Sequence, residues 1–162
     1  MTGVEASGVA WTHLWAGEFM ENSALWAEQI RTTGQVRDGY PSSANAAIAM
    51  GDIAAVAATV LRQASHAGRT YELTGPQTLT RAERVALIGA ALGRPVPYVE
   101  LTHDDAVAEL TPIMGEYAAW YVDGMAQLAA HPQPATTTIE EVTGRPATTF
   151  AEWAVQHAGD FR

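Results

Sequence analysis

Hydrophobic residues along the chain fall alternately into short runs and into stretches with helical spacing. Residues 9–14 are a short, mostly apolar run, which predicts a buried strand. Apolar side chains then recur near helical spacing over residues 19–30, and Gly34 follows them as a helix stop. Residues 34–45 are rich in Gly, Pro and Ser and are predicted to form a loop.

The remainder of the chain continues to alternate between helices and strands. Asp52 is expected to cap an apolar helix, because its carboxylate can accept the free backbone N–H groups of the first turn. Residues 70–74 and 96–101 have the composition of strands. Thr80 and Thr149 each begin a T-x-x-E capping box ahead of an apolar stretch. This alternation predicts an α/β fold with a small, partly parallel sheet and flanking helices.

Composition narrows the possible classes of protein. The 162 residues match the size of one domain, so residues 1–162 are predicted to form a single domain. The net charge is −9 and the nine basic residues, all Arg, are scattered, so nucleic acid and an anionic membrane surface are not expected as partners. The N-terminal residues lack a signal-peptide pattern, and the longest apolar run, residues 53–61, is too short to span a bilayer. A cytoplasmic location is therefore expected.

Three polar residues are candidates for catalysis. His13 lies between Trp11 and Trp15 on one face of the first predicted strand, where it could act as a general acid or base or could be a buried, hydrogen-bonded side chain. Tyr40 lies on the predicted loop, where binding residues are common, although it could also be an ordinary surface aromatic. Asn22 could hydrogen-bond a substrate carbonyl or hold a loop.

A second group of residues could line a pocket for a flat hydrophobic ligand, or could be ordinary core. Glu18 could also be a plain helix cap, because the helix dipole stabilises a carboxylate at that end. The predicted substrate-binding residues are Trp15, Glu18, Phe19, Met20, Trp26, Met114, Tyr117 and Tyr121. No metal site is expected, since the chain has no Cys and no H-x-x-x-H spacing.

Several segments resemble one family when they are taken in order. AWTHLWAGEFMEN (residues 10–22) resembles the segment W-T-x-L-R-P-G-x-F-M-E-N of the NmrA-like, atypical short-chain dehydrogenase/reductases. Four later segments of this chain also resemble segments of that family: GDIAAVAATVL (51–61), TYELTGPQTLTRAE (70–83), LGRPVPYVEL (92–101) and VTGRPATTFAEWAVQHAGDF (142–161).

The resemblance is to the C-terminal, substrate-binding half of the family fold, and it implies a truncated Rossmann-like architecture. The family's nucleotide-binding half opens on a Gly-rich turn, but neither G-x-G nor G-x-x-G occurs in this chain. A Tyr-x-x-x-Lys dyad is impossible without Lys, and Trp15-Ala16 replaces the family's Arg-Pro. We therefore expect no cofactor for this chain alone.

These observations favour a small-molecule-binding protein or non-redox enzyme that has lost its cofactor half. An isomerase, cyclase or dehydratase acting on a hydrophobic, aromatic or polyketide-like metabolite is the leading prediction. The alternatives are a non-catalytic sensor or partner subunit, and a truncated or split NAD(P)H-dependent reductase that needs a separate nucleotide-binding half. Half of such a sheet would leave strand edges uncovered, so a homodimer or another protein partner is expected to cover them.

Overall fold

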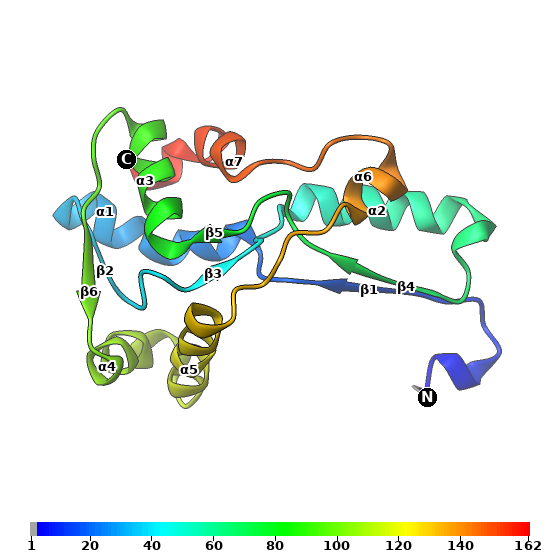
Figure 1. Cartoon of the computed structure of the whole chain (residues 1–162), viewed down its shortest axis with the longest axis horizontal. Coiled ribbons are helices and arrows are strands. Elements are labelled where there is room, and N and C mark those ends of the chain that lie inside the picture. The colour runs from blue at the N-terminus through cyan, green and yellow to red at the C-terminus, as the bar shows by residue number, and fades with distance from the viewer. Residues whose placement is uncertain (1–2) are drawn as a thin grey trace.

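The computed structural model describes residues 3–162 as an elongated molecule in which helices surround pairs of short strands (Figure 1). The strands are β1 (Thr12–Ala16), β2 (Val36–Gly39), β3 (Ala44–Asn45), β4 (Arg69–Leu73), β5 (Leu79–Thr80) and β6 (Tyr98–Leu101). The α-helices are α1 (Ala27–Thr33), α2 (Met50–Arg62), α3 (Arg81–Leu92), α4 (His103–Met114), α5 (Tyr117–Ala130), α6 (Thr138–Thr143) and α7 (Phe150–Gln156). The 3₁₀-helices are η1 (Glu5–Ser7), η2 (Met20–Trp26), η3 (Ala64–His66) and η4 (Ala158–Phe161).

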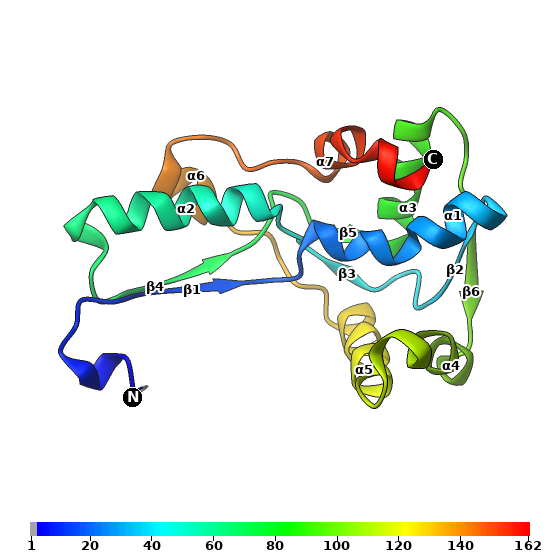
Figure 2. The same cartoon turned by 180° about the vertical axis from the view of Figure 1, so that it is seen from behind.

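Strands β1 and β4 form a parallel pair at one end of the molecule, joined through helix α2. Thr12 lies opposite Arg69, and Ala16 lies opposite Leu73. Helices α2 and α6 pack on the same side of this pair (Figures 1 and 2), and Leu14 contributes to the apolar cluster beneath them. This helix–strand alternation confirms the predicted α/β class.

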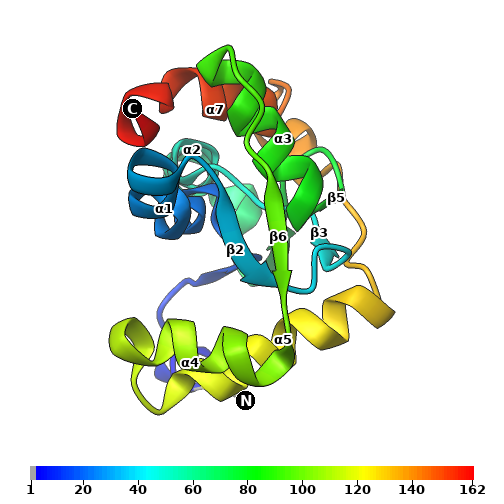
Figure 3. The same cartoon turned by 90° about the vertical axis from the view of Figure 1, so that its left-hand side faces the viewer.

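The other end of the molecule is built on two more strand pairs. Strand β2 is parallel to β6, with Val36 opposite Tyr98, and β3 is antiparallel to β5. Figure 3 shows α1, α3 and α7 around the upper part of the β2–β6 pair and α4 with α5 beyond the arrowheads of these strands. The prediction that residues 34–45 are a loop is therefore wrong. Gly and Ser in this stretch concealed two strands, and Val36 is fully buried against the core.

Among residues 3–162, side-chain caps are present on three α-helices, α3, α4 and α7. Both capping boxes are present. The Thr80 and Thr149 hydroxyls accept the backbone N–H at N3, and the Glu side chain at N3 accepts the backbone N–H of the Thr. The prediction that Asp52 caps α2 is wrong, because the helix begins at Met50 and Ala49 is the N-cap residue. The Asp52 carboxylate accepts the Thr148 N–H at 2.7 Å instead, and so ties α2 to the segment before α7.

The largest core cluster joins η2, α1, α3 and α7. Its members are Met20, Trp26, Ala27, Ile30, Val36, Ala47, Ala49, Val85, Ile88, Val96, Phe150, Trp153, Ala154 and Phe161. Among residues 3–162, no helix combines the length and the apolar character that crossing a membrane would need.

One face of the β1–β4 pair lacks a covering helix in the part of the chain that the structure describes (Figures 1 and 2). Parallel sheets are normally buried on both faces. Side chains alternate along a strand, so His13 and Trp15 lie on the face opposite Leu14. Trp15 is accordingly 66% exposed. The outer edge of β1 pairs with no other strand of residues 3–162.

Candidate functional site

A buried ion pair just beyond β1 forms the base of the candidate site. The Glu18 carboxylate accepts hydrogen bonds from Arg84 Nη1 at 3.0 Å and from the Asn45 amide at 2.6 Å. Arg84 also donates to Asn45 Oδ1 at 2.7 Å, so the three side chains form a closed triangle. The Ile48 N–H donates to the Glu18 carbonyl at 2.9 Å, which fixes the backbone that carries the carboxylate.

A second buried ion pair lies beside the first. Arg81 Nη2 donates to Asp38 Oδ2, and Trp26 Nε1 donates to the same oxygen at 2.7 Å. The Arg81 guanidinium also lies 4.9 Å from the centroid of the Trp26 ring, within the range of a cation–π contact. The Gly39 N–H donates to Asp38 Oδ1 at 2.8 Å. Both carboxylate oxygens of Asp38 therefore have partners.

Helix α3 supplies both cations. Thr80 caps this helix, which places Arg81 in the first turn and Arg84 three residues later on a neighbouring position of the same side. Both side chains are buried. The capping chemistry of one helix thus aligns two guanidinium groups with the carboxylates of two other segments.

Helix α5 completes a cavity of about 350 Å³ over this polar base. The Tyr121 hydroxyl donates to Glu18 Oε1 at 3.3 Å, which links the helix to the ion pair. A volume of this size falls within the usual range for small-molecule sites, about 300–1,000 Å³. The lining residues are Glu18, Asn22, Ser43, Asn45, Arg81, Trp120, Tyr121, Gly124, Met125 and Leu128.

Electrostatics fix the charge states of these groups. Burial alone would raise the pKa of Glu18, but Arg84, the Asn45 amide and Arg81 together hold that pKa below its ordinary value. Glu18 is therefore ionised at neutral pH. Burial raises the pKa of Tyr121, so its hydroxyl keeps its proton. Burial alone would lower the pKa of Arg81, but the charge and hydrogen bond of Asp38, together with Tyr121 and Tyr98, raise that pKa above its ordinary value.

The structure brings together some of the residues predicted from the sequence and separates others. Glu18, Asn22 and Tyr121 line the cavity. Met20 and Trp26 are buried in the core cluster, and Trp26 reaches the site through its hydrogen bond to Asp38 and its ring contact with Arg81. The predicted pocket residues Phe19, Met114 and Tyr117 do not line the cavity.

Tyr40 lies outside the cavity and ties three elements together. Its backbone has φ of 47°, in the left-handed region that residues other than Gly and Asn rarely adopt. Its hydroxyl lies 3.1 Å from Nδ1 of His103, the first residue of α4. The opposite ring nitrogen of His103 lies 3.7 Å from the Asp123 carboxylate on α5. Tyr40 is therefore linked through His103 to α5, the helix that forms one wall of the cavity.

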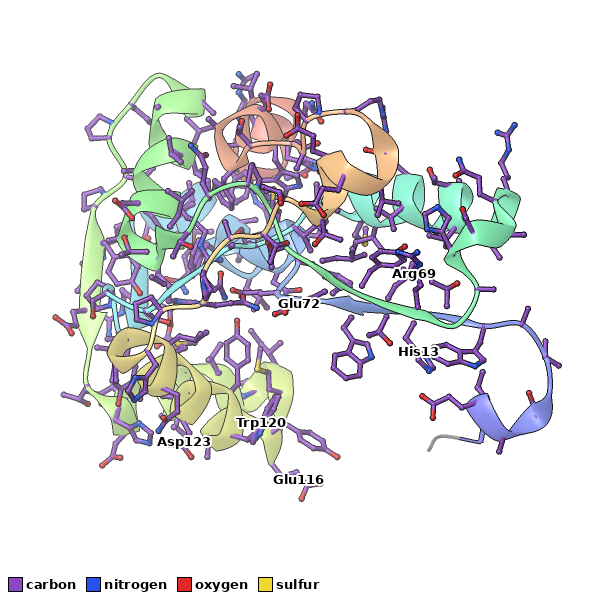
Figure 4. The ribbon with its side chains drawn as sticks, turned by 45° about the vertical axis from the view of Figure 1, so that its right-hand side comes forward. His13, Arg69, Glu72, Glu116, Trp120 and Asp123 are labelled. Carbon is purple, nitrogen blue, oxygen red and sulfur yellow. The ribbon has the colours of Figure 1, made fainter. Side chains whose placement is uncertain are left out.

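His13 and Trp15 also lie away from the cavity, on the uncovered face of β1. His13 Nε2 is 3.3 Å from the Glu5 carboxylate of η1, and its ring centroid is 4.5 Å from that of Trp11. Figure 4 shows His13 beside the strand pair that carries Arg69 and Glu72, whereas Trp120 and Asp123 of α5 lie in another part of the molecule. The unusual His that the sequence singled out thus belongs to the open sheet face.

Sequence reasoning pointed to Glu18 but missed its partners in the polar base of the cavity. Ser43 and Asn45 fall in the stretch predicted to be loop, so no periodicity pointed to them. Arg81 and Arg84 did carry a signal, because two Arg three residues apart precede the apolar helix VALIGAAL. Among residues 3–162, no group of three or more His, Cys, Asp or Glu residues is placed to hold a metal ion.

This arrangement, a polar-based cavity beside a half-covered parallel sheet, corresponds to part of an oxidoreductase fold. No family model matches the chain. It is 40% identical to an NAD(P)H azoreductase of Xenophilus azovorans over 98% of the chain and 56% of that enzyme. It is 36% identical to a (4-alkanoyl-5-oxo-2,5-dihydrofuran-3-yl)methyl phosphate reductase of Streptomyces griseus, over 98% of the chain and 57% of that enzyme. The chain thus spans little more than half the length of these relatives.

Solved structures agree with this assignment. An NADPH-dependent quinone oxidoreductase from Escherichia coli, solved with NADPH, matches with a TM-score of 0.79 and 26% identity over 94% of the chain and 55% of that protein. A triphenylmethane reductase from Citrobacter sp. shares the fold, with a TM-score of 0.79 at 18% identity over 96% of the chain and 55% of that protein. The predicted resemblance to the C-terminal half of an NmrA-like reductase is confirmed.

Two predictions made from the sequence are wrong. The leading prediction of a non-redox isomerase, cyclase or dehydratase is overturned, because the relatives are named as reductases. The expectation of no cofactor for this chain alone is overturned as well, since the relatives include an NAD(P)H azoreductase and a quinone oxidoreductase solved with NADPH. The absence of a Gly-rich turn from this chain does not indicate loss of the cofactor, because the chain matches only part of each relative.

Proposed function

We propose that this chain forms the acceptor-binding part of an NAD(P)H-dependent reductase. The observation that carries the proposal is the cavity between Glu18, Asn22 and α5, which combines hydrogen-bonding groups with an aromatic and aliphatic wall. The reductase names of the relatives at 36% and 40% identity supply the class of reaction. The acceptor would be a small unsaturated compound that fits about 350 Å³.

The described residues do not fit the pyrophosphate of a dinucleotide. Backbone N–H groups on a Gly-rich turn at the start of a helix normally bind that group. No two Gly of this chain are closer than four positions, as Gly89 and Gly93 are. We therefore assign the Gly-rich turn that binds the pyrophosphate to protein outside residues 3–162.

The uncovered end of the molecule offers a surface for that protein. A groove of about 530 Å³ follows β1 and α2. Its lining includes Trp11, Leu14, Val60 and Leu61, and the exposed Trp15 lies on the adjoining open face. We infer that a nucleotide-binding unit adds a strand beside β1 and covers this face, because parallel sheets are buried on both sides. A homodimer that covers the same face is the alternative partner.

The proposed function can be tested by reconstitution. We would combine the chain with the part of the Xenophilus azovorans azoreductase that it does not match, and would follow NADPH oxidation with an azo dye or a quinone. Activity is expected only in the mixture. If the assembled mixture binds NADPH but reduces neither type of acceptor, the proposed reductase function is wrong.

Substitutions at the surface test the partner. Trp15→Asp should abolish assembly, because it places a charge in the interface. Val155→Asp on α7 is the matched control, since Val155 is also 66% exposed but lies on another part of the molecule. Light scattering on the chain alone distinguishes the homodimer: a dimer that Trp15→Asp dissociates would favour a second copy as the partner.

A further inference from the structure

The charges around the cavity bear on which acceptors it can hold. Glu18 lines the cavity as an ionised carboxylate, with Oε2 bound to Arg84 and Asn45 and Oε1 bound only to Tyr121. Its side chain is still 17% exposed. A ligand in the cavity therefore meets a carboxylate whose Oε1 is bound by a neutral hydroxyl, while its Oε2 is paired with Arg84.

The cations near the cavity are already engaged. Arg84 donates to both Glu18 and Asn45, and only 2% of its side chain is exposed. Arg81 lines the cavity but is bound to Asp38 and stacked against Trp26. Among residues 3–162, no Lys or Arg other than Arg81 lines the cavity. A bound anion would thus have to compete with carboxylates that already hold the guanidinium groups.

The wall of the cavity is mainly aromatic and apolar. Tyr121, Met125 and Leu128 lie at helical spacing along α5, and Trp120 stands at the mouth with 74% exposure. Figure 4 shows Trp120 projecting from the same helix as Asp123, with Glu116 just before that helix, so that two further carboxylates belong to this part of the chain. With a net charge of −9, the molecule as a whole also repels anions.

We propose that the cavity selects neutral, flat, unsaturated acceptors such as quinones, and excludes those that carry an anionic group. The proposal rests on the proposed reductase function and names its substrate class. Asn22, Ser43 and Tyr121 would provide hydrogen bonds to the carbonyl or azo atoms of the acceptor, and Glu18 would set the charge preference. It separates this chain from its relative in Streptomyces griseus, which is named for a phosphate ester.

A matched pair of ligands tests the proposal on the unmodified chain. We would measure the dissociation constants of 1,4-naphthoquinone and of 1,4-naphthoquinone-2-sulfonate by equilibrium dialysis. Two like charges close together in a partly buried site repel strongly, so the neutral quinone should bind at least ~10-fold more tightly. Equal or tighter binding of the sulfonate would overturn the proposal, and so would failure of both ligands to bind.

Two variants locate the origin of the preference. Glu18→Gln should reduce the ratio of the two dissociation constants to about threefold or less, because it removes the fixed charge. Glu116→Gln is the control: it makes the same chemical change at the residue before α5, outside the cavity lining, and should leave the ratio unchanged. A ratio that Glu116→Gln lowers as much as Glu18→Gln does would contradict a local origin. Circular dichroism verifies folding, and the ligand comparison on the unmodified chain stands even if Glu18→Gln fails to fold.

This test is independent of the reconstitution experiment. Selective binding of the neutral quinone, together with an inactive reconstituted mixture, would support the charge preference while refuting the reductase function. Active reduction of both quinones at equal efficiency would support the reductase function while refuting the charge preference.

Discussion

The Glu18–Arg84 pair shows how one buried contact can serve both folding and ligand choice. Each charge is costly to bury alone, and the Asn45 amide satisfies part of both groups. Breaking such a pair is more destabilising than replacing both partners, because a single substitution leaves one charge without compensation.

Arg84→Met should therefore lower the free energy of unfolding by about 3–5 kcal/mol. The double variant Glu18→Gln/Arg84→Met should recover part of this loss, since no charge then remains unpaired. Urea denaturation of both variants measures the difference. A double variant less stable than Arg84→Met would show that the pair is not the source of the effect.

Acid should weaken the fold through the same carboxylate. The pKa of Glu18 is lower in the folded chain than its ordinary value, so the stabilisation is present above the unfolded pKa of about 4.3 and is lost as the pH falls through the folded pKa. Unfolding free energies measured across this range should decline more steeply for the natural chain than for Glu18→Gln/Arg84→Met. Parallel pH profiles would contradict the assignment.

His13 should contribute little to binding in the cavity. It contacts Glu5 and Trp11 on the open sheet face, outside the lining of the cavity. His13→Ala is expected to leave the dissociation constant of 1,4-naphthoquinone within about twofold, because distant and independent sites show little coupling. Equilibrium dialysis provides the measurement. A larger change would restore His13 as a candidate residue of the acceptor site.

At the scale of elements, α3 is the part of the chain that most directly positions the site. Its capping box fixes the first turn, from which Arg81 and Arg84 reach two different carboxylates. The Thr80 hydroxyl accepts the Glu83 N–H at 3.1 Å, and the Glu83 carboxylate accepts the Thr80 N–H at 2.7 Å.

Thr80→Ala should cost about 1 kcal/mol of stability, the usual value for loss of an N-cap side chain. Thr80→Ser keeps an acceptor oxygen and should restore most of this loss. Thermal and urea unfolding of both variants provide the comparison. If Thr80→Ser is as unstable as Thr80→Ala, the side-chain cap is not what stabilises the start of α3.

Local chemistry predicted the elements better than it predicted the site. Capping boxes at Thr80 and Thr149 were evident because their signal lies within four residues. The strand at Val36 was missed because its polar neighbour Asp38 is compensated by Arg81, which is 43 positions away. Contacts between distant segments leave no periodicity in a sequence. The pairing of Arg81 with Asp38 and of Asn45 with Glu18 could therefore be assigned only from the fold.

At the scale of the whole molecule, the uncovered face and edge of β1 are the main unsatisfied feature. An edge strand presents unpaired N–H and C=O groups that can bind another strand. Exposed apolar side chains on and near that strand, including Val9, Trp15 and Leu61, add to this surface.

Hydrogen exchange should report the binding of a partner at this surface. We expect the amides of Thr12–Ala16 and those near Leu61 to become more protected in the reconstituted mixture, because a new strand would pair with β1. Amides of α7 should change little and serve as the internal control. New protection confined to α4 and α5 would place the partner elsewhere.

The left-handed backbone of Tyr40 has a consequence for stability. A side chain at φ of 47° stores backbone strain of about 1–3 kcal/mol, which persists only while neighbouring structure enforces it. The Tyr40 hydroxyl contacts His103 on α4, and the other ring nitrogen of His103 lies 3.7 Å from Asp123 on α5. Tyr40→Gly would remove both the backbone strain and the contact with His103, whereas Tyr40→Phe would remove only the contact of the hydroxyl with His103. The difference in stability between these two variants would therefore report the backbone strain at residue 40, together with the entropy that Gly adds to the unfolded chain.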